Sequence, residues 1–324
     1  MIISKTPFRI SFCGGGTDLP SYYHKNGGCV VSTSIDKFVY ITMEKSFHKN
    51  LTTIKYSSVE TVDDVEFIKH PIFREVFQKY MVKGVEVGSI SDIPAGTGLG
   101  SSSAFTVGLE NIIRTYKKKK VSKEILATEA CDIELNRLGE SIGKQDQYAS
   151  AYGDLNFISF NKDDTVNVEP IRLSAEQKKE LSDNLMMFYL GGTRKASRII
   201  KSYDSNKPDL NSKKDRMADL AKKLRDDLNS GDIESLGKIL DEGWKIKKTL
   251  SNGVSTPLID DTYDLAKNNG AVGGKLLGAG GSGFILLYVD KDNQKNVSNA
   301  LSDFRKLDFN FYEKGSEIVY NDYW

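Results

Sequence analysis

The chain has 324 residues, which is more than one hydrophobic core usually serves and suits two domains. Its hydrophobic fraction of 39% and charged fraction of 27% are those of ordinary globular proteins, and 45 Lys and Arg against 44 Asp and Glu leave a net charge of +1. This balance lacks the positive excess of nucleic-acid-binding proteins, and no apolar run approaches the ~18 residues of a membrane span, so we expect a cytoplasmic protein that binds neither nucleic acid nor membrane.

Strands and helices are expected to alternate in the first half of the chain. Runs of β-branched and aromatic residues predict strands, and apolar residues at helical spacing predict helices. The expected strands are residues 30–35, 38–41, 85–89, 155–160 and 166–173, and the expected helices are 71–82, 101–116, 122–138 and 141–152. Lysines 117–120 could form a nucleic-acid or membrane patch, but they are better explained as cations that complement the dipole at the end of a helix.

The second half of the chain is expected to be mainly helical. Ser174 and Gln177 have the spacing of a capping box at the start of a helix. We expect a buried strand at 185–190, helices at 209–229 and 233–250, a glycine-rich stretch at 270–283 and a strand at 284–289. The change from strand-rich to helix-rich sequence predicts two domains, residues 1–180 and 181–324.

Cysteines and histidines indicate no further chemistry. Cys13, Cys29 and Cys131 are an odd set without short spacing, which argues against a disulfide framework and favours reduced thiols. The three histidines are scattered, so they form no zinc-binding motif.

The most informative segment runs from Pro94 to Ala104, between an expected strand and the helix that starts at Ser101. Its three alternate glycines let the backbone approach a ligand closely. Its three serines fall in the first helical turn, where unpaired N–H groups and the helix dipole favour an anion such as polyphosphate. No Lys-Ser or Lys-Thr follows the glycines, so this is not a Walker loop. A glycine-rich turn with ordinary serine capping explains less of the pattern.

A second glycine run, Gly278 to Gly283, matches the dinucleotide-binding pattern G-x-G-x-x-G. That pattern must follow a strand and open a helix. Here it leads into the expected strand 284–289, so we reject a nicotinamide-dependent oxidoreductase.

Three segments resemble, in the same order, the motifs of the GHMP kinases, the family of galactokinase, homoserine kinase, mevalonate kinase and phosphomevalonate kinase. Pro94–Ala104 resembles the phosphate-binding motif, Thr6–Asp18 the N-terminal substrate motif, and Lys275–Phe284 the third, glycine-rich motif. The resemblance implies an α+β, two-domain GHMP kinase fold, with a ribosomal S5 domain 2-like N-terminal domain and a ferredoxin-like C-terminal domain. ATP and the substrate would lie between the two.

The resemblance assigns ATP to the phosphate-binding motif. Nine residues of this chain would contact the nucleotide: Pro94, Gly96, Thr97, Gly98, Leu99, Gly100, Ser101, Ser102 and Ser103. Many members of the family have alanine in place of Ser103, a departure that we expect to leave phosphate binding intact. The resemblance also implies Mg²⁺ between the Ser102 hydroxyl and the Glu134 carboxylate. From its position alone, Glu134 would be taken for a solvated residue of helix 122–138.

The resemblance places the chemistry at Asp146 and Arg9. Asp146, within Gly143–Gln147, would orient the acceptor hydroxyl and take its proton, and Arg9 would lie beside it and offset charge on the transferring phosphoryl group. A helix cap at Asp146 and a surface ion pair at Arg9 are the simpler alternatives. That Asp146 and Arg9 are both inert although the phosphate motif is intact is the weaker explanation.

Other details resemble sugar kinases. Thr17 and Asp18 resemble the pair with which galactokinase binds sugar hydroxyls, and Gly280 and Gly281 of the third motif are also expected near the substrate. The chain has Gly14-Gly15-Gly16 where galactokinase has Gly-Glu-His. The run Gly14–Tyr23 instead resembles the D-glycero-D-manno-heptose 7-phosphate kinases, which phosphorylate the anomeric hydroxyl to supply nucleotide-activated heptose synthesis. The alternatives are another GHMP sugar kinase, such as a galactokinase or fucokinase, and a non-catalytic sensor of sugar and ATP.

A sugar phosphate needs a second cationic site. Gly191–Arg198, with Arg194 at its centre, combines a turn, an expected helix start and three cations, although an exposed helix start explains it equally well. The expected ligands are thus a small sugar phosphate, ATP and Mg²⁺. The sequence leaves a homodimer open.

Overall fold

Two β-sheets organise the structure. The computed structural model describes residues 1–48, 50–193, 196–203 and 208–323, and in these ranges the strands form an eight-stranded and a four-stranded sheet. The larger sheet has the order β12-β1-β2-β5-β3-β4, with β6 paired to β2 and β7 to β6. Its strands are β1 (Ile2–Cys13), β2 (Gly28–Lys45), β3 (Thr52–Lys55), β4 (Val59–Val62), β5 (Val85–Ser91), β6 (Leu155–Phe160), β7 (Val166–Pro170) and β12 (Glu317–Asn321).

The smaller sheet has the order β11-β8-β10-β9 and is built from the C-terminal half of the chain. Its strands are β8 (Leu185–Tyr189), β9 (Ala271–Leu276), β10 (Phe284–Val289) and β11 (Arg305–Lys306). Its strand pairs, β8 with β10, β9 with β10 and β8 with β11, are antiparallel, whereas the larger sheet contains the parallel pair β3 with β5.

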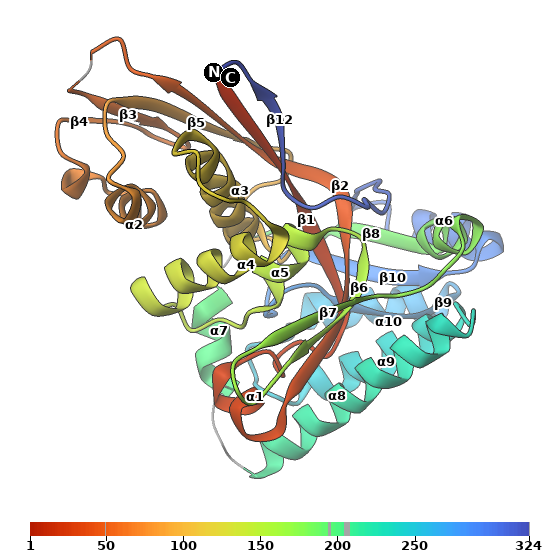
Figure 1. The fold of residues 1–324 in the computed structure, drawn as a ribbon. Coiled ribbons are helices and arrows are strands. Elements are labelled where there is room, and N and C mark those ends of the chain that lie inside the picture. The colour runs from red at the N-terminus through yellow and green to blue at the C-terminus, as the bar shows by residue number, and fades with distance from the viewer. Residues whose placement is uncertain (49, 194–195, 204–207, 324) are drawn as a thin grey trace.

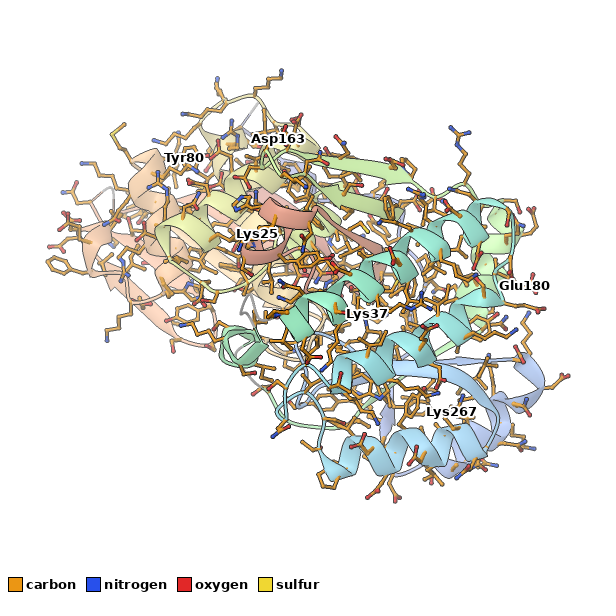
Figure 2. The ribbon with its side chains drawn as sticks, turned by 90° about the horizontal axis from the view of Figure 1, so that it is seen from below. Lys25, Lys37, Tyr80, Asp163, Glu180 and Lys267 are labelled. Atoms are coloured by element: carbon orange, nitrogen blue, oxygen red, sulfur yellow. The ribbon has the colours of Figure 1, made fainter. Side chains whose placement is uncertain are left out.

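Helices pack against both sheets (Figure 1). The α-helices are α1 (Pro20–Asn26), α2 (Pro71–Tyr80), α3 (Ser101–Tyr116), α4 (Lys123–Cys131), α5 (Gln145–Tyr152), α6 (Ala175–Asp183), α7 (Ala196–Tyr203), α8 (Pro208–Asn229), α9 (Ser235–Lys248), α10 (Pro257–Asn268) and α11 (Gln294–Ala300). Helix α3 packs on β1 and β2, and α9 packs on β9. Figure 2 shows α9 between α8 and α10, with charged side chains such as Glu180 at the outer edge. No helix in the described ranges is long and apolar enough to cross a membrane.

Most expected elements are confirmed, and their ends follow local chemistry. Ser122 caps α4 by accepting from the Ile125 N–H at 3.2 Å, and the capping box at Ser174 and Gln177 opens α6. The strands expected at 30–35 and 38–41 are one strand, β2. The interruption between them is a bulge, because Pro7 pairs with Phe38 while Phe8 pairs with Ile35.

Three expectations are wrong in detail. The helix expected over 122–138 ends as an α-helix at Cys131 and continues as a π-helical turn, Asp132–Arg137. The helix expected from residue 141 begins only at Gln145, because the preceding residues pass close to Asp18: a Cβ at Gly143 would lie 1.8 Å from its carboxylate. The glycine-rich stretch 270–283 contains a strand that the pattern did not predict, β9, whose glycines Gly273 and Gly274 lie against α9 and β10.

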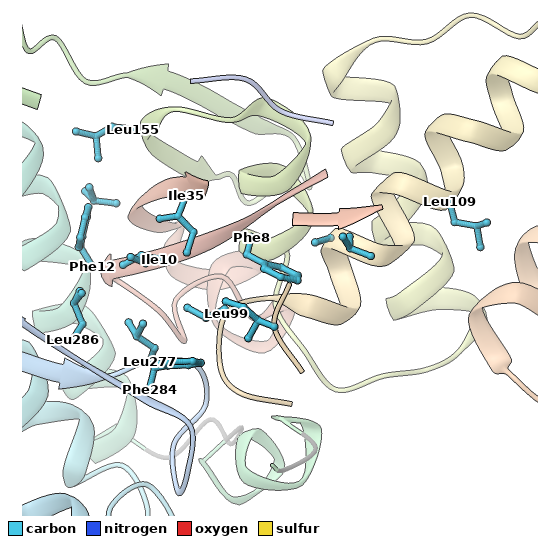
Figure 3. Packing of buried hydrophobic residues seen from close by; sticks show 14 of the residues in the cluster. Phe8, Ile10, Phe12, Ile35, Leu99, Leu109, Leu155, Leu277, Phe284 and Leu286 are labelled. Carbon is cyan, nitrogen blue, oxygen red and sulfur yellow. The ribbon is translucent and has the colours of Figure 1, made fainter. Parts of the chain in front are cut away.

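A continuous apolar core joins the two sheets. Phe8, Ile10 and Phe12 of β1 belong to the same buried cluster as Leu277, Phe284 and Leu286 from the β9–β10 region. Figure 3 shows Leu99 between Phe8 and the Leu277–Phe284 pair. Leu99 is fully buried, and burial of such a side chain contributes about 1.5–3 kcal/mol. The core thus fixes the loop on either side of Leu99 against both sheets.

The first and last strands of the chain are paired with each other. Strand β12 pairs antiparallel with β1, with Asn321 opposite Ile2, so both termini lie at the same edge of the larger sheet (Figure 1). The division at residue 180 stays a prediction.

Candidate active site

A cavity of about 390 Å³ opens where the elements of the two sheets meet. Its walls include Arg9 and Ser11 of β1, the glycine-serine loop before α3, and Asp146 at the start of α5. From the C-terminal half, Lys247 of α9, Lys275 of β9 and the loop after β9 complete it. The cavity therefore collects residues from all three segments that resemble family motifs.

The glycine-serine loop is held by its own hydrogen bonds. The Thr97 hydroxyl donates to the Pro94 carbonyl at 3.0 Å, and the Gly96 N–H donates to Ser101 Oγ at 3.3 Å. Gly100 occupies the N-cap position of α3 with φ +75°, a left-handed conformation that suits glycine. The first N–H groups of α3 have no partner within the helix, and Ser101, Ser102 and Ser103 line the cavity, so this helix start offers backbone donors to an anion.

The two glycine runs touch through their backbones. A Cβ on Gly98 would lie 2.6 Å from the Leu277 carbonyl oxygen, and a Cβ on Gly283 would lie 2.3 Å from that of Thr97. Side chains at these positions would push the loops apart. The run Gly278–Gly283 thus joins β9 to β10 and braces the phosphate-binding loop, which agrees with our rejection of a dinucleotide site.

Glu134 is buried beside the loop, not solvated. It lies in the π-helical turn after α4, a geometry often found at functional sites, and is 2% exposed. Ser102 Oγ donates to Oε1 at 2.8 Å, and Gln147 Nε2 donates to Oε2 at 2.6 Å. Burial raises the pKa of Glu134 to about 7, while hydrogen bonds from Ser103, Ser102 and Gln147 oppose that shift.

The Ser102–Glu134 pair has the chemistry of a magnesium site. Mg²⁺ prefers oxygen ligands and is usually held by one or two carboxylates together with substrate phosphates and water. The described residues contain no cluster of three or more His, Cys, Asp or Glu that could hold a metal. Ser102 and Glu134 could supply one hydroxyl and one carboxylate to such an ion.

Arg9 and Asp146 form a two-pronged ion pair at the centre of the cavity. Arg9 Nε donates to Oδ1 and Nη2 to Oδ2 of Asp146, both at 2.7 Å, and Nη1 donates to the Gly98 carbonyl at 2.7 Å. Arg9 is 3% exposed, whereas the Asp146 side chain keeps 24% exposure. The pair thus ties β1, α5 and the phosphate-binding loop together, with the carboxylate open to the cavity.

Asp18 lies beside this pair, and Thr17 lies behind it. The Asp18 carboxylate accepts from the Gly16 N–H at 2.8 Å and the Gln145 N–H at 3.3 Å, and it lines the cavity. Burial raises its pKa, the Gly16 hydrogen bond opposes this, and the charge of Asp146 adds to it. Thr17 is fully buried, and its hydroxyl donates to the carbonyls of Gly14 and Cys29. Its side chain holds the Gly14–Asp18 turn.

The remaining substrate candidates are more distant from the ion pair. Gly280 lines the cavity, while Gly281 lies in a second hollow beside Gly192 and Thr193, with its N–H donated to the Val254 carbonyl at 2.9 Å. Arg194 lies outside the described residues.

Sequence reasoning assigned no role to three residues of the cavity region. Gln147 holds Glu134, and it sits in the segment that drew attention to Asp146. Lys275 begins the third motif, yet its ammonium group reaches back to β1. Lys247 has the helical context of a surface lysine, and only its place in the fold shows that it is buried.

Two family models match parts of this chain. Residues 66–154 match the model of the GHMP kinases N terminal domain, and residues 222–306 match that of the GHMP kinases C terminal. The D-glycero-alpha-D-manno-heptose 7-phosphate kinase of Campylobacter jejuni is 30% identical over 333 residues, covering 97% of each chain.

Solved structures share the fold over nearly the full length. The D-glycero-D-manno-heptose 1-phosphate kinase of Bacteroides thetaiotaomicron superposes with a TM-score of 0.80 at 24% identity, covering 99% of this chain and 100% of that one. The phosphomevalonate kinase of Streptococcus pneumoniae, in complex with phosphomevalonate and AMPPNP, has a TM-score of 0.79 at 15% identity, covering 98% and 100%. The expected α+β, two-domain architecture is confirmed.

Proposed function

This chain belongs to the GHMP kinase family and is an ATP-dependent sugar kinase, and we propose that its acceptor is D-glycero-D-manno-heptose 7-phosphate. The γ-phosphate of ATP would move to the anomeric hydroxyl and give the 1,7-bisphosphate, the form needed for nucleotide-activated heptose synthesis. The identity of 30% over 97% of a heptose 7-phosphate kinase supports this acceptor over galactose or fucose.

One observation carries the reaction type: the Arg9–Asp146 pair and the phosphate-binding loop share one cavity, joined by the bond from Arg9 to the Gly98 carbonyl. In the proposed reaction the acceptor oxygen forms a bond to the γ-phosphorus while the bond from that phosphorus to the bridging oxygen breaks. Asp146 takes the hydroxyl proton, and ADP leaves. Arg9 aligns both oxygens of Asp146 and offsets negative charge on the transferring group.

The loop and its neighbours would bind the nucleotide. Gly96–Ser103 would hold the phosphates with backbone N–H groups, the α3 dipole and serine hydroxyls. Ser102 and Glu134 would hold Mg²⁺, which when bound supplies charge neutralisation for the phosphates. Asp18 would accept a hydrogen bond from a sugar hydroxyl, since its carboxylate faces the same cavity.

ADP release tests the proposal directly. We expect turnover with D-glycero-D-manno-heptose 7-phosphate that exceeds turnover with galactose, fucose, mevalonate and homoserine. Turnover with mevalonate or homoserine alone would reject a sugar acceptor. Preference for galactose or fucose would retain the sugar kinase and reject the heptose assignment.

A further inference from the structure

Two lysine side chains are buried in the wall of the active-site cavity. Lys247 of α9 is 7% exposed and Lys275 of β9 is 6% exposed, and both line the cavity with Arg9. Lys275 Nζ donates to the Ser11 and Phe12 carbonyls at 2.9 Å each. Lys247 Nζ donates to the Leu276 carbonyl at 3.2 Å and to the Gly278 carbonyl. Within the described ranges, neither ammonium group forms an ion pair with a carboxylate.

This arrangement leaves both groups able to donate to a ligand. A lysine ammonium group has three N–H donors, and the backbone carbonyls take two from each lysine. One donor of each lysine is left, and both lysines line the cavity. Buried ammonium groups that serve no ligand are rare, because removing the charge from water is unfavourable unless a partner compensates it.

The surrounding charges also favour an anion. Burial lowers the pKa of Lys275 to about 8, with the nearby Cys13 opposing and Arg9 adding to the shift. Burial lowers the pKa of Lys247 well below its usual value, and the charges of Lys275 and Arg9 add to this. Asp146 is paired with Arg9, whereas neither lysine has a carboxylate partner among the described residues, so an anion bound here would stabilise the charged form of either lysine.

We infer that Lys247 and Lys275 form a binding site for a phosphate group of the reactants, an inference that rests on the proposed function. The bond from Lys247 to the Gly278 carbonyl places it at the contact between Gly278 and Gly98, next to the Gly98 carbonyl that Arg9 binds. Two phosphates can reach such a place: the acceptor's own phosphate and the γ-phosphate of ATP. A dianionic phosphate accepts from several cationic donors at once, as this wall requires.

The substitution Lys247→Met tests the site, because methionine has similar length without charge or donors. The matched control is Lys245→Met, which removes the same charge from the exposed face of α9. ADP release is measured against the concentrations of heptose 7-phosphate, unphosphorylated heptose and ATP.

If the site takes the acceptor's phosphate, Lys247→Met raises KM for heptose 7-phosphate at least ~10-fold and leaves the KM values for heptose and ATP unchanged. If it takes the γ-phosphate, kcat falls at least ~10-fold with both acceptors and every KM is kept. The control keeps all constants in either case. Unchanged constants in Lys247→Met overturn the inference while the kinase assignment stands, whereas an unmodified protein inactive with every sugar overturns the proposed function.

A measurement on the unmodified protein remains decisive if the variant fails to fold. Heptose 7-phosphate is titrated at pH 8 without Mg²⁺, in two buffers of different ionisation enthalpy. An anion bound to these lysines stabilises their charged forms, so we expect proton uptake on binding. ATP is titrated in the same way to cover the γ-phosphate, and binding of both ligands without proton uptake overturns the inference.

Discussion

At the scale of single residues, Arg9 fixes the orientation of the Asp146 carboxylate. Both of its oxygens accept from Arg9, and Arg9 also donates to the Gly98 carbonyl of the glycine-serine loop, so the carboxylate is held beside that loop in the cavity. Thr17, by contrast, acts on the backbone of its own turn. A residue that faces the cavity, such as Asp18, can therefore be adjacent in sequence to one that holds the backbone in place, such as Thr17.

Asp146→Asn is expected to reduce turnover at least ~10²-fold, because asparagine keeps the shape but cannot accept the hydroxyl proton. ATP affinity should change little, because Arg9 keeps its hydrogen bond to the Gly98 carbonyl, but the melting temperature should fall, because the buried guanidinium loses its counter-charge. The surface variant Asp163→Asn, in the turn between β6 and β7, should keep full activity (Figure 2). A sharp fall in melting temperature with unchanged turnover per folded molecule would make Asp146 a structural residue.

The residue patterns predicted part of this site. Local sequence indicated an anion at Gly96–Ser103, because loop and helix start are adjacent along the chain. Arg9 and Asp146 are 137 residues apart, and only the family resemblance predicted that they meet. Helical periodicity could not show that Glu134 lies in a π-helical turn, which changes the direction of its side chain relative to a regular helix.

At the scale of elements, α3 begins at the wall of the cavity and carries a buried acid further along. Glu110 is fully buried, accepts from the Tyr80 hydroxyl at 2.7 Å, and lies 3.9 Å from Lys79. Burial raises the pKa of Glu110 to about 7, and the Lys79 charge opposes this. Its protonated form is therefore favoured on folding.

This shift predicts a pH-dependent stability. A carboxyl with a raised pKa in the folded protein stabilises it fully below pH ~4.5, and that contribution is lost as pH rises through about 7. We therefore compare the change in the free energy of unfolding that Glu110→Gln causes at each pH. This change should be more stabilising at pH 8 than at pH 5, by about 1–3 kcal/mol. Urea unfolding at both pH values measures this. An equal effect at pH 5 and pH 8 would contradict the assignment.

The ends of helices and strands were less predictable than their presence. Caps and capping boxes were visible in sequence, as at Ser122 and Ser174. The strand β9 was hidden because its glycines, which read as a loop, are needed for close packing on α9: a Cβ on Gly273 would lie 1.9 Å from the Gly237 carbonyl oxygen. Tertiary packing, which no local pattern contains, overrode the propensity of glycine.

At the scale of the whole molecule, a shared core connects the two sheets. Phe12 of β1 and Leu286 of β10 belong to one buried cluster (Figure 3). Composition predicted two domains. It could not predict that β12 pairs with β1 or that one buried cluster includes residues of both sheets, because both depend on contacts between residues far apart in the sequence.

Leu286→Ala should lower the free energy of unfolding by about 2–5 kcal/mol, because it leaves a cavity in the shared core. Since the core spans both sheets, we expect them to unfold together. Hydrogen exchange of peptides from β1 and β10 measures this at increasing denaturant. Loss of protection in β10 while β1 keeps its own would show that the sheets unfold independently.

In the proposed reaction, a phosphoryl group is transferred in this cavity to the anomeric hydroxyl of a sugar phosphate. ³¹P NMR of the reaction of heptose 7-phosphate with ATP tests it most directly. We expect a second phosphorus resonance on the sugar, coupled to the anomeric proton, that grows in step with ADP. A new phosphate coupled to any other sugar proton, or ATP that stays intact beside an unchanged heptose 7-phosphate, would contradict it.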